Sequence, residues 1–141
     1  MSQDMRGLDI TLRAGANINT TTADFRAVQI GSAMSALICA SMTSKPIGVL
    51  QNRPKDNTGA SCQVRVAGVT KLYLNDTCTA GDLIGIYTSG TAMRLVGVSV
   101  TGATIGSVLG RALEASAITG TVISLLLMPY TIPGSLTVTF E

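Results

Sequence analysis

The chain lacks the residue pairs on which most enzyme chemistry depends. It contains no histidine, so a nucleophile–histidine pair and a mixed Cys/His zinc site are both excluded. A Ser–Lys or Cys–Asp pair remains conceivable. The lysines, however, fall in turns or on the exposed faces of predicted strands, at Lys45, Lys55 and Lys71. We therefore predict that the protein is not an enzyme.

Two carboxylates and three thiols could bind a metal ion, but their spacing argues against it. Asp76 and Asp82 flank the turn TCTAGD and could chelate calcium. Aspartates in turns usually accept hydrogen bonds from nearby backbone amides, so we interpret both as turn and capping residues and leave ion binding open. Cys39, Cys62 and Cys78 are odd in number and form no Cys-x-x-Cys motif, which predicts buried, reduced thiols. We expect no cofactor and no metal.

The composition indicates a surface covered by other protein. Charged residues make up 13% of the 141 residues and aromatic residues 4%, without tryptophan, while the mean hydropathy is +0.42. From Leu83 to Phe140 the only charges are Arg94, Arg111 and Glu114. A monomer usually carries charges of both signs over its whole surface, although a Ser/Thr-rich surface is an alternative explanation. The net charge of +2 without a basic cluster predicts no nucleic-acid partner.

The hydrophobic segments are too short to cross a membrane. The longest lie at 122–128 and in the mixed stretch 31–42, whereas a spanning helix needs about 20 apolar residues. The second stretch also lacks a basic leader, so we expect neither a membrane partner nor a cleaved signal peptide.

Short segments of alternating hydrophobicity, separated by turn residues, predict an all-β fold with little helix. In CQVRV, for example, Cys62, Val64 and Val66 would face inward. Gly68 then interrupts the pattern, and the next segment is either a hairpin partner or a bulged continuation. The predicted strands of the compact part lie at 25–30, 35–40, 44–52, 62–66, 69–76, 83–87, 91–98, 104–116 and 117–129.

These segments divide the chain into three regions. The sequence pattern of residues 1–23 predicts an N-terminal arm, which would become ordered only on contact with a neighbouring surface. Residues 24–129 predict the β-rich domain, and residues 130–141 an extended C-terminal strand. That last strand, with Leu136, Val138 and Phe140 on one face, would pair either with the edge of a neighbouring subunit or with its own domain.

The order of several phrases resembles the capsid cement (head decoration) proteins of tailed bacteriophages. The phrases are FRAVQI, PIGVLQNRP, CQVRVAGVTKLYL, TAGDLIGIY and IGSVLGRALEASAITGTVISLLL, and they cover residues 24–128. The resemblance implies a small β-sandwich or barrel-like domain of the β-tulip type, with an arm and a C-terminal extension. It also implies a viral structural protein on the outer capsid surface, present in the host cytoplasm during assembly. Such a protein stabilises the head by bridging major capsid proteins and is itself commonly a homotrimer, less often a dimer.

On this interpretation the arm would contact the capsid and the closing strand a second subunit. The capsid contacts would be Arg6, Leu8, Ile10, Leu12 and Arg13, and the subunit contacts Leu136, Val138 and Phe140. The alternative is a virion β-sandwich module that binds carbohydrate or a host surface. Sugar platforms rest on exposed tryptophan and tyrosine, so the absence of tryptophan disfavours it. A small hydrolase is disfavoured by the absence of histidine.

Overall fold

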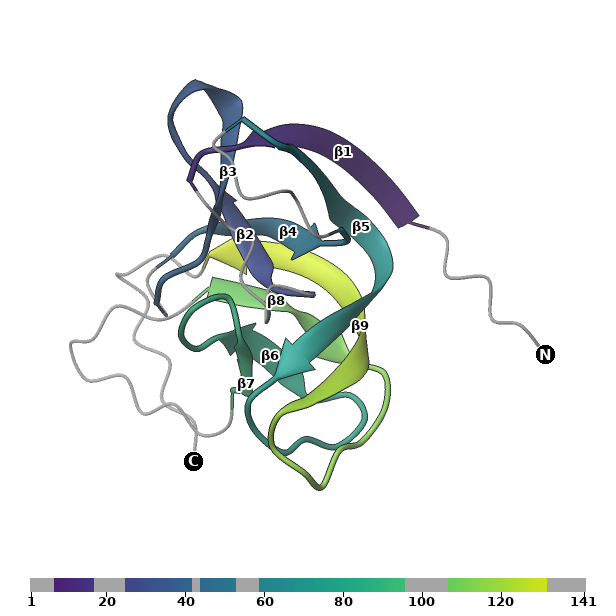
Figure 1. Ribbon diagram of the computed structural model, residues 1–141. Coiled ribbons are helices and arrows are strands. Elements are labelled where there is room, and N and C mark those ends of the chain that lie inside the picture. Colours follow the sequence, from purple (N-terminus) through teal and green to yellow (C-terminus); the bar gives the residue numbers. More distant parts are fainter. Residues whose placement is uncertain (1–6, 17–24, 42–43, 53–58, 96–106, 132–141) are drawn as a thin grey trace.

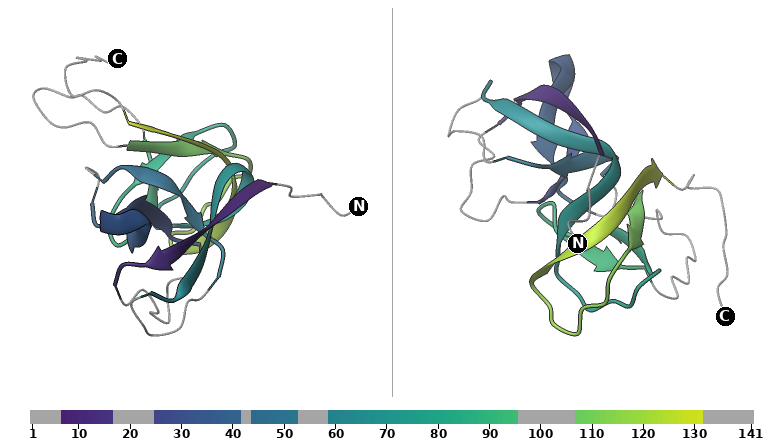
Figure 2. Two further views of the ribbon diagram at one scale, coloured as in Figure 1. Left: turned by 90° about the horizontal axis from the view of Figure 1, so that it is seen from above. Right: turned by 90° about the vertical axis from the view of Figure 1, so that its right-hand side faces the viewer.

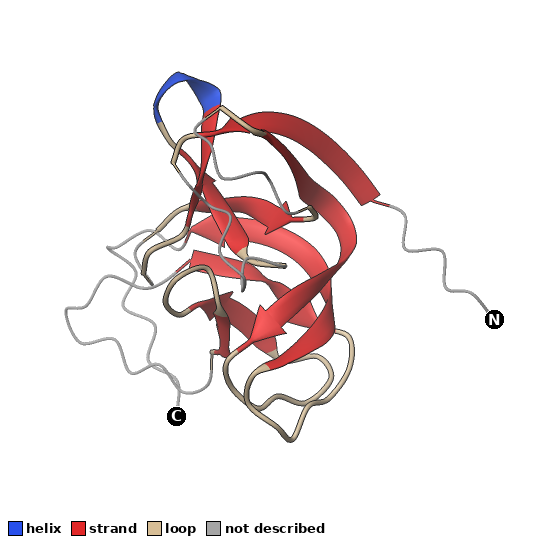
Figure 3. Cartoon of the chain, viewed as in Figure 1, coloured by secondary structure: helices blue, strands red, loops and turns tan. Residues whose placement is uncertain are grey.

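Alternating apolar and polar residues form strands through most of the chain. The computed structural model describes residues 7–16, 25–41, 44–52, 59–95 and 107–131. Within them the all-β prediction is confirmed (Figures 1 and 3). The elements are β1 (Gly7–Ala14), β2 (Ala27–Ile30), the 3-10 turn η1 (Ser32–Met34), β3 (Ser35–Ile38), β4 (Pro46–Leu50), β5 (Ser61–Leu74), β6 (Leu83–Ile86), β7 (Ala92–Arg94), β8 (Ser107–Ala112) and β9 (Thr121–Thr131).

The fourteen-residue strand β5 connects the two halves of the molecule. It runs unbroken through Gly68, which has a positive φ of 94°, so the second segment is the bulged continuation and not a hairpin partner. Its first half pairs with β1 and β4, and its second half pairs with β7 and β9. Figures 1 and 2 show β5 passing from the part that holds β1 to β3 into the part that holds β6 and β7.

The nine strands form one mixed sheet that closes twice on β5. Its order is β1-β3-β2-β4-β5-β7-β6-β8-β9, with additional pairings of β1 and β9 to β5. The first ring therefore contains β1 to β5 and the second ring β5 to β9. The sheet is barrel-like, and it is not a sandwich of two separate sheets.

Each ring encloses its own hydrophobic core. Strands β2 and β4 supply both cores, because successive side chains of a strand point to opposite faces. Ala27 and Val49 belong to the larger core, with the residues of the second ring, while Val28 and Leu50 belong to the smaller core of the first ring. Aliphatic side chains and small residues fill both, as the low aromatic content requires.

The expected arm is a strand over the part that the structure describes. β1 pairs with β5 from Gly7 to Arg13 and with β3 at Arg13 and Ala14. Leu12 is only 6% exposed and Ala14 is buried, and both lie in the core of the first ring. The alternation at Leu8, Ile10 and Leu12 therefore builds the domain itself, because the ring cannot close without this strand. Residues 1–6 and 17–24 lie outside the described part.

The last strand also differs from its expected end at Pro129, since β9 continues to Thr131. β9 pairs with β5 only as far as Leu127, and beyond that point it pairs with β8. One edge is then free of β5, and a proline without an N–H group is tolerated at such an edge. Residues 132–141, with Leu136, Val138 and Phe140, lie outside the described part.

Candidate contact surface

The two aspartates of the TCTAGD turn act as backbone caps. Asp76 accepts hydrogen bonds from the backbone amides of Thr77 (2.7 Å) and Arg94 (3.1 Å). Asp82 accepts one from the amide of Thr79 (2.8 Å). The interpretation as turn and capping residues is confirmed. No group of three or more potential metal-ligating side chains occurs in the described ranges.

The three cysteines are buried and free, as predicted. Burial raises the pKa of the Cys39 thiol to about 12, and it also raises the pKa of Cys62 and of Cys78. A thiol acts as a nucleophile or metal ligand only as the thiolate. All three side chains are therefore held in their unreactive form at neutral pH.

A Ser–Lys contact joins β5 and β9, and its position does not suit catalysis. The Nζ of Lys71 donates a hydrogen bond to the Oγ of Ser124 at 3.0 Å. Both residues lie on the outer face of the sheet, because their neighbours Leu72, Ile123 and Leu125 point into the core. A nucleophilic serine needs a desolvated base and donors for an oxyanion, and an open sheet face supplies neither.

The largest run of apolar side chains on this face belongs to β9. Ile123, Leu125 and Leu127 fill the core, while Val122, Leu126 and Met128 point outward and remain 37–42% exposed. A strand that is apolar on both faces is normally covered on both. The outward face of β9 is therefore a candidate contact surface.

The neighbouring strands extend this surface. Leu126 lies opposite Val69 of β5 and opposite Arg111 of β8. Leu113 donates its backbone amide to the carbonyl of Ser124 at 2.9 Å and has an exposed side chain. We call this patch the outer wall; it consists of Val69, Leu113, Val122, Leu126 and Met128.

Two opposite charges flank Ser124 on the outer wall, and a third charge, Arg111, is exposed on β8 opposite Leu126, where its Nη1 donates a hydrogen bond to the carbonyl of Gly81 at 3.0 Å. Lys71 pairs with Ser124 from the β5 side. On the β8 side, the Oε1 of Glu114 accepts a hydrogen bond from the amide of Ser124 at 2.9 Å. Neither Lys71 nor Glu114 forms an ion pair with another described residue. The Glu114 side chain is exposed and that of Lys71 is half-buried.

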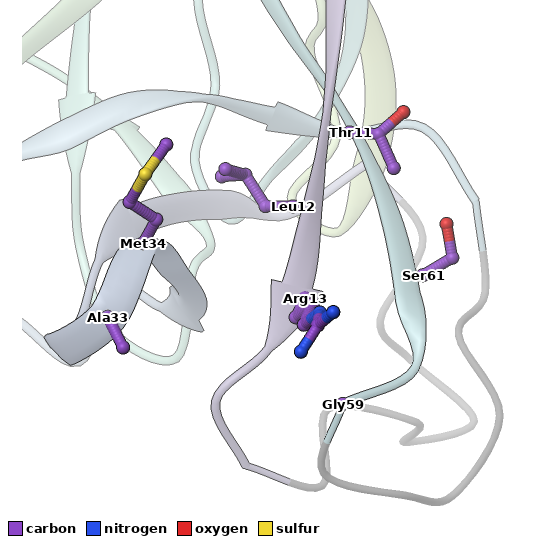
Figure 4. A pocket seen from close by; sticks show the side chains of 7 residues that line it. All are labelled: Thr11, Leu12, Arg13, Ala33, Met34, Gly59 and Ser61. Atoms are coloured by element: carbon purple, nitrogen blue, oxygen red, sulfur yellow. The ribbon is translucent and has the colours of Figure 1, made fainter.

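A second exposed region surrounds the end of β1 and the tip of the β2–β3 hairpin. A hollow of about 500 Å³ is lined by Thr11, Leu12, Arg13, Ala33, Met34, Gly59 and Ser61 (Figure 4). Met34 is 74% exposed at its rim. Ala33 and Met34 both have positive φ values, of 55° and 56°, a conformation that L-residues avoid. We call this region the β1–hairpin face.

The structure separates the expected capsid contacts into accessible and inaccessible residues. Leu8 is 60% exposed and Arg13 is exposed, so both are available to a partner. Leu12 is buried and Ile10 packs against the same core, which removes Leu12 as an external anchor. Arg6 lies outside the described part.

Sequence reasoning missed Met34 and the position of the outer wall. Ala-Met is not a sequence that predicts a turn with two positive φ values, so nothing in the pattern indicated an exposed tip there. The outer wall had a signal, namely the uninterrupted apolar run VISLLLM, but a run of this kind does not reveal which residues face outward.

Comparison with solved structures shows which fold this is. The chain has the fold of the N base of the head fibre protein gp8.5 of bacteriophage phi29, with a TM-score of 0.59 and 19% sequence identity over 90% of this chain and 98% of that chain. No family model matches the sequence, and no curated protein matches it. No described helix is long and apolar enough to cross a membrane.

Proposed function

We propose that the protein is a non-enzymatic structural component of a bacteriophage head. In this role it binds the outer surface of the capsid and stabilises it by bridging major capsid proteins. The observation that carries the proposal is the fold, which matches the phi29 head fibre base along nearly its whole length. The low charge of the second half of the chain supports it, because burying an unpaired charge costs several kcal/mol.

The β1–hairpin face is the side that we assign to the capsid. It combines the exposed apolar side chain of Met34 with the cationic side chain of Arg13, and Leu8 adds a second exposed apolar side chain at the start of β1. An anchor of this composition suits a shell that offers apolar pockets and carboxylates. The remaining expected contacts, at Arg6 and in the last ten residues, stay predictions: Leu136, Val138 and Phe140 would bind a second copy.

Co-sedimentation with expanded heads that lack the protein tests the proposal. The full chain should pellet with the heads, and the double variant Leu8→Asp, Met34→Asp should bind at least about tenfold more weakly. Ile118→Asp, which changes an equally exposed residue of the β8–β9 loop, is the matched control and should bind normally. If the wild-type protein does not pellet with heads, the proposal is wrong.

A second candidate function is the base of a head fibre, because the phi29 protein with this fold is the base of a head fibre. Such a base would bind the head and carry a fibre that projects from it. Electron microscopy of particles with and without the protein distinguishes the two functions. A cement protein adds a low layer of density between capsomers, whereas a fibre base adds density that projects from the head.

A further inference from the structure

The outer wall is an exposed sheet face whose charges specify the partner. Its centre is apolar, and Lys71 and Glu114 stand on opposite sides of Ser124. A partner therefore needs an apolar centre with an acidic group facing Lys71 and a basic group facing Glu114. The outer wall of a second copy offers this arrangement.

We propose that two copies of the chain pair through their outer walls about a two-fold axis that runs along β9. Rotation about this axis places the β5 side of one copy over the β8 side of the other. Lys71 of each copy then faces Glu114 of the other, and Leu126 faces Leu126. An axis across the strands at Ser124 would instead bring Lys71 over Lys71 and Glu114 over Glu114, so these two charges favour the first orientation, in which Arg111 faces Val69 of the other copy.

The packing requirements of two facing sheets agree with this arrangement. Aligned sheets pack about 10 Å apart with interdigitated side chains, a gap that a lysine and a glutamate can span together. From Val122 to Met128 the wall is about 20 Å long at roughly 3.3 Å per residue, and it is three strands wide. A patch of this size lies near the lower limit for specific interfaces, so we expect dissociation in the micromolar range.

Pairing through the outer walls would occur in the free protein, whether or not the protein binds heads. It also differs from the trimer that the resemblance to cement proteins implies. A two-fold contact uses the same patch on both copies, and the Lys71–Glu114 pair occurs twice in it.

Sedimentation velocity over a concentration series tests the proposal first with an apolar variant. The wild-type chain should form dimers, and Leu126→Asp should be a monomer with an unchanged far-ultraviolet circular dichroism spectrum. The matched control is Ile30→Asp, which changes a similarly exposed residue on β2 in the first ring, and it should remain dimeric. A wild-type monomer at all concentrations, a trimer, or a dimer that persists in folded Leu126→Asp would overturn the proposal.

Two charge variants provide a test that does not depend on the core. Lys71→Glu alone and Glu114→Lys alone should each weaken the dimer about tenfold or more, because each places like charges together twice. A mixture of the two variants should form heterodimers at close to wild-type strength, since both contacts are then restored. A purely internal role of either residue predicts no rescue on mixing. If head binding falls in Leu126→Asp while the oligomeric state does not change, the wall contacts the shell and the proposal is wrong.

Discussion

Relaxing the strained tip of the β2–β3 hairpin should stabilise the protein. Ala33 and Met34 are the central residues of this turn, and Ser35 donates its backbone amide to the carbonyl of Ser32. Positive φ values at both central positions define the turn that Asn-Gly favours. The double substitution Ala33→Asn, Met34→Gly supplies that sequence without altering either core.

The expected gain follows from the backbone conformation. A left-handed conformation costs a residue with a side chain about 1–2 kcal/mol, asparagine tolerates it better, and glycine adopts it freely. The greater entropy of glycine in the unfolded chain cancels about 0.5–1 kcal/mol of this gain. The variant should therefore be about 1–2 kcal/mol more stable, which raises Tm by about 3–8 °C for a domain of this size.

Thermal unfolding followed by circular dichroism measures this difference, and Met34→Ala is the control. Alanine removes the exposed side chain but keeps the positive φ, so its Tm should stay close to that of the wild type. Both variants should bind heads more weakly if the tip contacts the capsid. An unchanged or lower Tm for the Asn-Gly variant would show that the turn stores no strain.

Three further changes test the packing and electrostatics. Gly110→Ala should lower the free energy of unfolding in urea by more than about 3 kcal/mol, because a Cβ there would overlap the backbone carbonyl of Leu126. Gly81→Ala is the control: a Cβ there meets open space and only the positive φ of 91° is unfavourable, so the loss should be about 1 kcal/mol. Burial raises the pKa of the Cys39 thiol from 9 to about 12, so the folded state favours the neutral thiol. This contribution to the free energy of unfolding is complete below pH 9 and is lost between pH 9 and about 12. Urea unfolding should therefore show a fall of about 1.4 kcal/mol per pH unit in this range, and a smaller fall in Cys39→Ala. In the 2.7 Å ion pair between Asp9 and the guanidinium of Arg65 on β5, the Asp9 side chain is 36% exposed and the Arg65 side chain 17%. Urea unfolding of Asp9→Asn should show a loss of about 1 kcal/mol, and a much larger loss would show that the burial of Arg65 makes the pair stronger than an exposed one.

The fold class was predictable because strand periodicity is a local property. Buried and exposed positions alternate through Cys62 and Val64 as the pattern of CQVRV requires. The same logic predicted β2, β4, β6 and β9 close to their observed positions. Turn residues between these segments completed the signal, and no long-range information was needed.

The closure of the sheet was not predictable in the same way. Whether β5 continues through Gly68 depends on strands that are distant in sequence, because β1 and β9 both reach this residue, through Gly7 and Leu127. The prediction that residues 7–14 belong to an arm outside the domain was wrong for the same reason. Leu12 is an anchor for a neighbour or a core residue depending on whether a ring is present to receive it, and the segment alone contains no information about the ring.

The two candidate surfaces lie on different rings, and β5 belongs to both. The β1–hairpin face is part of the first ring, and the outer wall is part of the second. β5 pairs with β1 along its first half and with β9 along its second half, and these two pairings meet at Gly68. On its other edge it pairs with β4 at Val64 and Arg65 and with β7 at Leu74. If the β1–hairpin face binds a capsid and the outer wall binds a second copy, as we propose, a load on the first surface would pass along this continuous paired backbone to the second. This arrangement suits a protein that reinforces a shell, because bridging stabilises a head only as far as the bridge resists deformation.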